Sequence, residues 1–117
     1  MKKTGLITGG VITGIVLSFL LSLLNKDSFT VVAANETESK ILLFSIEIDD
    51  KVYSIKNIEK KTDKILNIPL SSENSYLVKV KFENGNEISG EGGYVEPGYI
   101  FYEFIRASEI EHRLRSL

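Results

Sequence analysis

Residues 76–83, YLVKVKFE, constrain the fold more than any other part of the chain. Every second residue from Tyr76 to Phe82 is apolar, and the residues between include two lysines, which is the pattern of a half-buried β-strand. Asn84 and Gly85 follow at once, and this pair is the strongest short-range signal for a β-hairpin. The centre of the chain is therefore predicted to be antiparallel sheet.

The length of the hairpin loop follows from which side chains it places on the same face. A two-residue turn would set Phe82 opposite Glu87 and push a carboxylate into the core. A three-residue loop that ends with Gly85 in the left-handed region pairs Val80 with Ile88 instead. We therefore predict the three-residue loop.

The same register accounts for the glycines that follow. It places Val78 opposite Gly90 and Tyr76 opposite Gly92, so that a large side chain lies over each glycine. Gly93 is then predicted as a β-bulge. Residues 96–98, Glu-Pro-Gly, predict a tight turn in which glycine takes the positive φ angle.

Other segments are also predicted as strands. Residues 41–48 alternate, with an inward face made of Leu42, Phe44, Ile46 and Ile48. An Asp-Asp turn at 49–50 leads to an antiparallel return over residues 51–58. Pro69 limits residues 65–70 to a sheet edge, whereas residues 99–105, apolar on both faces apart from Glu103, should lie centrally.

The last residues show helical signals. Ser108 and Glu111 fit a capping box, and Ile110, Leu114 and Leu117 recur at helical spacing. The predicted fold is mainly β: a small antiparallel β-sandwich or open barrel of five to six strands, with one N-terminal hydrophobic helix and a short C-terminal helix. Leu70 six residues before Tyr76 is similar to the tyrosine corner of immunoglobulin-like sandwiches, a resemblance that covers about a dozen residues.

The N-terminal third has a different character. Residues 4–25 carry no charge, and the apolar run 6–24 approaches the roughly 20 residues that a helix needs to cross a bilayer. Lys2 and Lys3 precede the run, so the positive-inside rule places the N-terminus in the cytoplasm and the remainder outside.

Two interpretations of this run stay open. Small residues near Ala34 resemble a signal peptidase site, which favours a cleaved signal and a secreted or periplasmic product. Four small residues spaced four apart favour an uncleaved anchor that packs against another membrane helix or its own copy: Gly10, Gly14, Ser18 and Ser22. The anchor is preferred because the apolar run is longer than a usual signal core. The predicted division is anchor or signal over 1–34, spacer over 35–40 and an extracytoplasmic β domain over 41–117.

Charge and residue inventory exclude several functions. Residues 35–117 carry 11 Lys and Arg against 15 Asp and Glu, a net charge of −4 that disfavours nucleic acid. The chain has no cysteine, and its single histidine, His112, accompanies no nucleophile motif. The spacing of Glu109 and His112 is assigned to a solvated helix face, and the carboxylates Glu91, Glu96 and Glu103 to surface charge. No catalytic residue, metal site or cofactor is predicted.

Recognition is the remaining class. The candidate partner-binding residues surround the predicted turn: Tyr94, Glu96, Tyr99 and Tyr102. The short Lys-Lys start and the Ile, Asn and Lys content are typical of a bacterial protein. The sequence thus predicts a non-catalytic, membrane-anchored binding or accessory protein of a bacterial cell envelope with a protein partner. A secreted binder or inhibitor is the alternative, and a small hydrolase is the third class.

Overall fold

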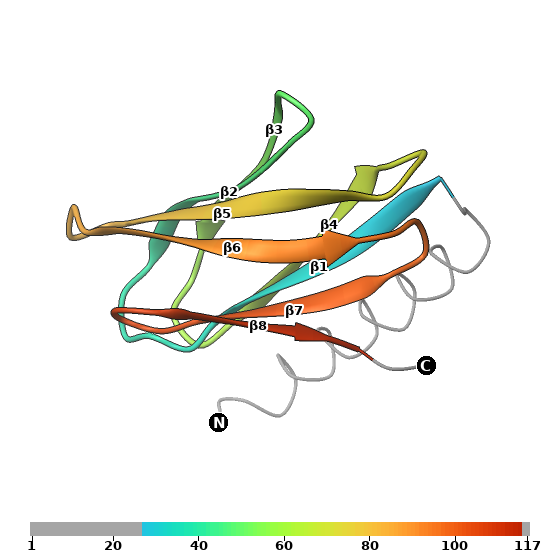
Figure 1. Cartoon of the computed structure of the whole chain (residues 1–117). Coiled ribbons are helices and arrows are strands. Elements are labelled where there is room, and N and C mark those ends of the chain that lie inside the picture. The colour runs from blue at the N-terminus through green and yellow to red at the C-terminus, as the bar shows by residue number, and fades with distance from the viewer. Residues whose placement is uncertain (1–26, 116–117) are drawn as a thin grey trace.

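The computed structural model describes residues 27–115, which form eight β-strands in two four-stranded sheets (Figure 1). The strands are β1 (Ser28–Asn35), β2 (Ile41–Ile48), β3 (Lys51–Ile58), β4 (Asp63–Pro69), β5 (Asn74–Phe82), β6 (Glu87–Val95), β7 (Ile100–Ile105) and β8 (Ile110–Leu114). The first sheet has the order β4-β1-β7-β8 and the second β3-β2-β5-β6. The prediction of a mainly β fold is confirmed, with eight strands in place of five or six. The predicted N-terminal helix lies outside the described residues.

One strand pair differs from the predicted antiparallel arrangement. β1 runs antiparallel to β4 but parallel to β7. The chain reaches β7 from β6 in the other sheet, so no hairpin forces β7 to oppose its neighbour β1. As predicted, β4 with Pro69 lies at a sheet edge and β7 lies centrally.

The sandwich has two ends, and we name them by the path of the chain. At the entry end β1 begins; here the Gly98 amide donates to the Ser28 carbonyl (2.7 Å) and the Leu70 amide to the Asp27 carbonyl (2.8 Å). At the far end lies the β5–β6 hairpin, where the Glu83 amide donates to the Lys40 carbonyl (2.9 Å). In Figure 1 the entry end is on the right and the hairpin on the left.

β1 is the most deeply buried strand, because all eight of its residues are buried. Residues 28–34, expected from the sequence to belong to the anchor or signal segment, form most of this strand. β1 lies between β4 and β7 and contributes Phe29 and Val31 to the core. A cut near Ala34 would therefore remove the strand that joins the two halves of the first sheet.

The core lies between the sheets and is rich in aromatic rings. Tyr76 from β5 contacts Phe29 from β1, with ring centroids 5.5 Å apart, and Phe101 from β7, at 5.7 Å. Each such ring buries a large apolar area, which stabilises the fold by about 1.5–3 kcal/mol per side chain. The predicted inward face of β2 is confirmed at three of its four positions, but Leu42 is exposed and Ile41 is buried instead. A register shift between β2 and β5 at this point turns Leu42 outward.

The β5–β6 hairpin confirms the predicted loop. Val80 pairs with Ile88, and Gly85 has a φ angle of 94°. Further along, Tyr76 pairs with Gly93 and not with Gly92, because the ladder shifts between Tyr76 and Leu77. The tyrosine ring still lies over Gly92: a Cβ added there would sit 2.0 Å from the ring.

The predicted C-terminal helix is wrong, because these residues form β8. Ile110 and His112 lie on its inward side, and Glu103 pairs with His112 in the antiparallel ladder with β7. Nine residues are marginal for an isolated helix, whereas the free edge of β7 offers a full set of backbone partners. The Glu111 carboxylate binds Arg106 in place of a helix-capping amide.

Asn35 closes the far end of β1. Its buried side-chain amide donates to the carbonyls of Ser39 (2.9 Å), Ile58 (3.1 Å) and Glu59 (3.2 Å). Its oxygen accepts from the amide (3.0 Å) and the hydroxyl (2.7 Å) of Thr37. The predicted spacer at 35–40 is thus tied into the domain.

Candidate functional site

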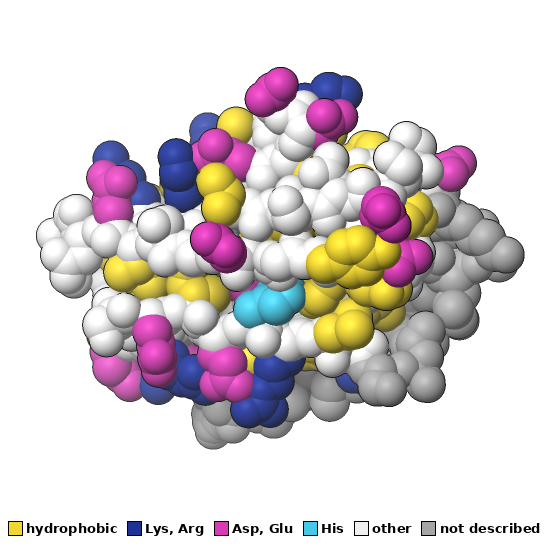
Figure 2. All heavy atoms as spheres, in the orientation of Figure 1, with side chains coloured by type: hydrophobic (Ala, Val, Ile, Leu, Met, Phe, Trp, Pro, Cys, Tyr) yellow, Lys and Arg dark blue, Asp and Glu magenta, His cyan; other side chains and the backbone are white. Residues whose placement is uncertain are grey.

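Exposed apolar side chains gather at the entry end on one face of the sandwich. Tyr94 and Leu114 are 53% and 52% exposed, and Tyr99 lies half-buried beside Tyr94, with ring centroids 6.5 Å apart. Leu114 pairs with Phe101 in the β7–β8 ladder, and the Phe101 ring lies 5.8 Å from the Tyr99 ring. We name Tyr94, Tyr99 and Leu114 the tyrosine patch. In Figure 2 hydrophobic side chains gather at the right-hand end of this face, next to acidic ones and to the histidine. The predicted turn positions the patch: the Tyr99 amide donates to the Glu96 carbonyl (3.2 Å), and Gly98 has a φ angle of 92°.

Two carboxylates orient the rings of the patch. Glu96 Oε2 accepts a hydrogen bond from the Tyr99 hydroxyl (3.1 Å). The Tyr94 hydroxyl shares its single hydrogen between Glu96 Oε2 (2.7 Å) and Glu73 Oε2 (2.8 Å). These hydrogen bonds to carboxylates raise the pKa of both tyrosine hydroxyls. Both hydroxyls therefore stay protonated as donors, and the rings are held at fixed angles.

Three of the four predicted partner-binding residues lie together, and one does not. Tyr94, Glu96 and Tyr99 share the patch and its rim. Tyr102 points to the outer face of the first sheet, where it stacks on Phe104 with centroids 5.7 Å apart and accepts a hydrogen bond from Arg115 (3.0 Å). Since successive side chains of a strand alternate between faces, Tyr102 and Phe101 cannot both face the core.

Behind the patch lies a buried polar cluster that the sequence did not indicate. Glu103 is fully buried, which corrects its assignment to surface charge. Its Oε2 accepts from the Tyr76 hydroxyl (2.5 Å) and lies 2.5 Å from His112 Nδ1. The His112 ring also stacks on Phe101 at 4.4 Å. The cluster joins β5, β7 and β8 and holds the edge strand β8 in place.

The Glu103 carboxyl has an unfavourable environment for its charge. Its second oxygen, Oε1, is buried and has no hydrogen-bond partner among the described residues. Burial raises the pKa of Glu103, while the hydrogen bonds from Tyr76 and His112 and the charge of His112 oppose that shift. Burial and the nearby carboxylate also raise the pKa of Tyr76.

The predicted tyrosine corner is wrong. In a tyrosine corner the hydroxyl bonds to the backbone a few residues upstream, whereas the Tyr76 hydroxyl donates to the Glu103 side chain.

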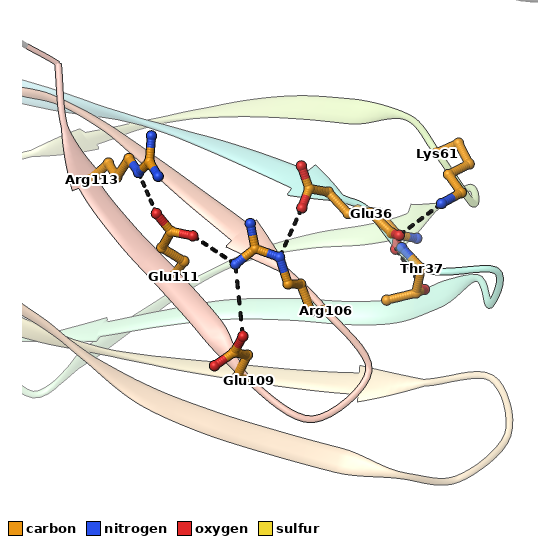
Figure 3. Close-up of polar contacts among 8 residues, drawn as sticks. Glu36, Thr37, Lys61, Arg106, Glu109, Glu111 and Arg113 are labelled. Carbon is orange, nitrogen blue, oxygen red and sulfur yellow. Dashed lines mark hydrogen bonds and ion pairs between the residues drawn. The ribbon is translucent and has the colours of Figure 1, made fainter.

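A second polar cluster at the far end has a structural role. Figure 3 shows the Arg106 guanidinium surrounded by carboxylates: Glu36 at 3.1 Å, Glu111 at 2.7 Å and Glu109 at 3.9 Å. Arg113 also binds Glu111, and the two arginines lower the pKa of that carboxyl. The ion pair between Arg106 and Glu36 ties the β7–β8 connection to the loop after β1. The three carboxylates also neutralise the charge of Arg106. Glu109 thus belongs to this cluster and not to a helix face with His112.

A surface pocket of about 570 Å³ opens beside this cluster, between the loop after β1 and the β5–β6 hairpin. Phe82, Asn84 and Arg106 contribute to its lining. Within residues 27–115 no group of three or more His, Asp or Glu side chains is placed to hold a metal ion. The same residues include no helix with the length and apolarity required to span a membrane. The predicted membrane segment with its small-residue ridge, Gly10, Gly14, Ser18 and Ser22, lies outside the described residues.

Comparison with known proteins adds a fold likeness. No protein-family model matches the chain, and no curated protein sequence matches it. The chain is similar in structure to a protein from Eubacterium rectale solved by NMR, with a TM-score of 0.57 and 10% sequence identity. The match covers 76% of this chain and 89% of the other. At this identity the likeness concerns the fold alone.

Proposed function

We propose that this chain is a membrane-anchored extracytoplasmic binding or accessory protein of a bacterial cell envelope, with a protein partner and no catalytic role. The tyrosine patch carries the proposal. Exposed, rigidly held aromatic side chains are the residues that most often anchor protein interfaces, because they bury a large area at little cost in conformational entropy. The apolar run 6–24 supports an anchor of membrane-spanning length.

The buried position of β1 supports the uncleaved form over the secreted alternative. Cleavage near Ala34 would leave only the last residue of a strand that is buried along its whole length. The mass of the protein recovered from its host distinguishes the two. An intact chain of 13.1 kDa in the membrane fraction is expected. Loss of the first ~34 residues would support the secreted binder, and an intact chain dissolved in the cytosol would refute both.

Binding is tested by paired substitutions in the full-length chain. Tyr94→Ser with Tyr99→Ser removes the rings of the patch, and Val52→Ser removes a side chain that is 62% exposed on β3, at the opposite edge of the sheet from β6. We expect crosslinking to a partner in intact membranes to be lost in the tyrosine double variant and kept in Val52→Ser. If the double variant unfolds before any binding is lost, the rings serve the core and the proposal fails.

One pair of residues bears on the third class, a small hydrolase. The Glu103 and His112 pair resembles a carboxylate–histidine unit, but the described ring contacts of His112 are with the core residues Tyr76 and Phe101. Turnover of ester or glycan substrates that depends on His112 would revive this class.

A further inference from the structure

We infer that the tyrosine patch works next to the lipid surface and receives a Lys or Arg side chain from an integral membrane protein. This inference rests on the proposed function, because it requires that residues 6–24 anchor the chain. It adds the class of partner and the chemistry of the contact.

The position of the patch follows from the reach of the chain. Ser28 begins β1 only four residues after Leu24, the last residue of the apolar run, and four residues span at most about 14 Å. The Gly98 amide is bonded to the Ser28 carbonyl, and the Thr30 amide donates to the Tyr99 carbonyl (3.0 Å). The turn that carries the patch is thus bonded directly to the start of β1. An anchored chain must hold this end of the sandwich beside the bilayer.

The chemistry of the patch suits a cation. The faces of aromatic rings attract Lys and Arg, and carboxylates add charge-assisted hydrogen bonds. The ion pairs among residues 27–115 involve other carboxylates, whereas Glu73 and Glu96 accept hydrogen bonds from the tyrosine hydroxyls. Among residues 27–115, two carboxylates beside two electron-rich rings therefore present a negative surface site that no Lys or Arg side chain pairs with.

The same charges favour a protein partner over the lipid itself. Tyrosine is common where proteins meet the lipid headgroups, but bacterial and other anionic membrane surfaces repel Glu73 and Glu96. A basic side chain of a neighbouring membrane protein matches both the rings and the carboxylates. A partner that stays far from the bilayer could not reach the entry end.

The position is tested first, by fluorescence quenching in vesicles. The chain contains no tryptophan, so Tyr94→Trp and Asn84→Trp each introduce a single tryptophan, whose fluorescence can be excited separately from that of the tyrosines. Asn84 lies in the far-end hairpin, about 27 Å away along the nine-residue strand β5. In vesicles of phosphatidylethanolamine and phosphatidylglycerol with a headgroup nitroxide, we expect at least threefold stronger quenching in Tyr94→Trp. Equal quenching in vesicle-bound protein would overturn the inference and leave the anchor intact. Failure to bind vesicles would overturn the anchor itself.

The partner chemistry is tested by photocrosslinking from Leu114, which leaves both tyrosines in place. Leu114→p-benzoylphenylalanine is irradiated in intact host membranes, with Val52→p-benzoylphenylalanine as the control position. We expect an adduct at 114 only, with a protein that resists carbonate extraction, and about tenfold less adduct when Glu73→Gln and Glu96→Gln are added. An adduct with lipid, an adduct with an extractable protein, or no effect of the glutamines in a variant with unchanged circular dichroism would overturn it.

Discussion

The Asn35→Ala substitution should destabilise the domain strongly, although Asn35 lies outside the apolar core. The Asn35 amide offers two hydrogens to three carbonyls, and its oxygen accepts two further bonds from Thr37. This amounts to about four full hydrogen bonds at roughly 0.5–1.5 kcal/mol each, and some of the partners left behind are buried. We expect a loss of about 4 kcal/mol in the free energy of unfolding. That is a large part of the roughly 5–15 kcal/mol typical of a small domain.

The measurement is urea unfolding of the full-length chain in detergent micelles, followed by the β-sheet circular dichroism signal. Asn84→Ala is the matched control, because Asn84 Oδ1 accepts one bond from the Asn86 amide (2.9 Å) in an exposed hairpin. The control should lose no more than about 1 kcal/mol. A loss in Asn35→Ala as small as in the control would show that the Asn35 side chain does not hold the end of β1.

Asn35→Asp separates the two halves of this side chain. It keeps the oxygen that accepts from Thr37, but places a second carboxylate oxygen against the carbonyls of Ser39, Ile58 and Glu59. Because a buried carboxylate next to acceptors is unfavourable, we expect at neutral pH a loss at least as large as for alanine. Protonation should relieve part of this loss in acid, so equal losses at both pH values would contradict this explanation.

Two further predictions concern the core around Tyr76. The Glu103→Gln variant tests the buried carboxyl: since folding raises the pKa of Glu103 above its ordinary value of 4.5, the native state binds more protons than the unfolded state in that range. The unsubstituted chain should therefore be most stable relative to Glu103→Gln below about pH 4.5, and this difference in the free energy of unfolding should shrink as pH rises through the raised pKa. Urea titrations at several pH values measure the difference. A difference that grows with pH would show that folding does not raise the pKa of Glu103. The Gly92→Ala variant should lower the free energy of unfolding by about 3 kcal/mol or more, because its Cβ would lie 2.0 Å from the Tyr76 ring. In Gly90→Ala the new Cβ would lie at an ordinary 3.8 Å from Ile110, so the loss should be about 1 kcal/mol or less. Similar melting temperatures for the two alanine variants would mean that Tyr76 moves aside freely.

Sequence patterns predicted the parts of the molecule whose cause is local. The alternation at 76–83, the three-residue hairpin loop and the turn at 96–98 all appear as predicted. Each depends on the conformational preferences of adjacent residues, above all glycine with a positive φ angle. The patch residues Tyr94, Glu96 and Tyr99 could be named in advance because they flank that turn.

Other features depend on contacts between residues far apart in the chain. Only four polar residues, 25–28, separate the apolar run from the rest of β1, so its pairing with β4 and β7 is what distinguishes β1 as a strand of the domain. β8 carries both helical and alternating spacing, and the open edge of β7 selects the strand. The register shift that exposes Leu42 likewise arises from the fit between β2 and β5.

The chain's own order of residues therefore determined a β-rich domain, its central hairpin and an acidic, cysteine-free composition behind a long apolar start. Tertiary structure alone decided that Glu103 is buried with Tyr76 and His112, and that Tyr102 faces away from the patch. The physical reason is that alternation assigns side chains to two faces, but which face is covered depends on the strands that the folded chain brings together.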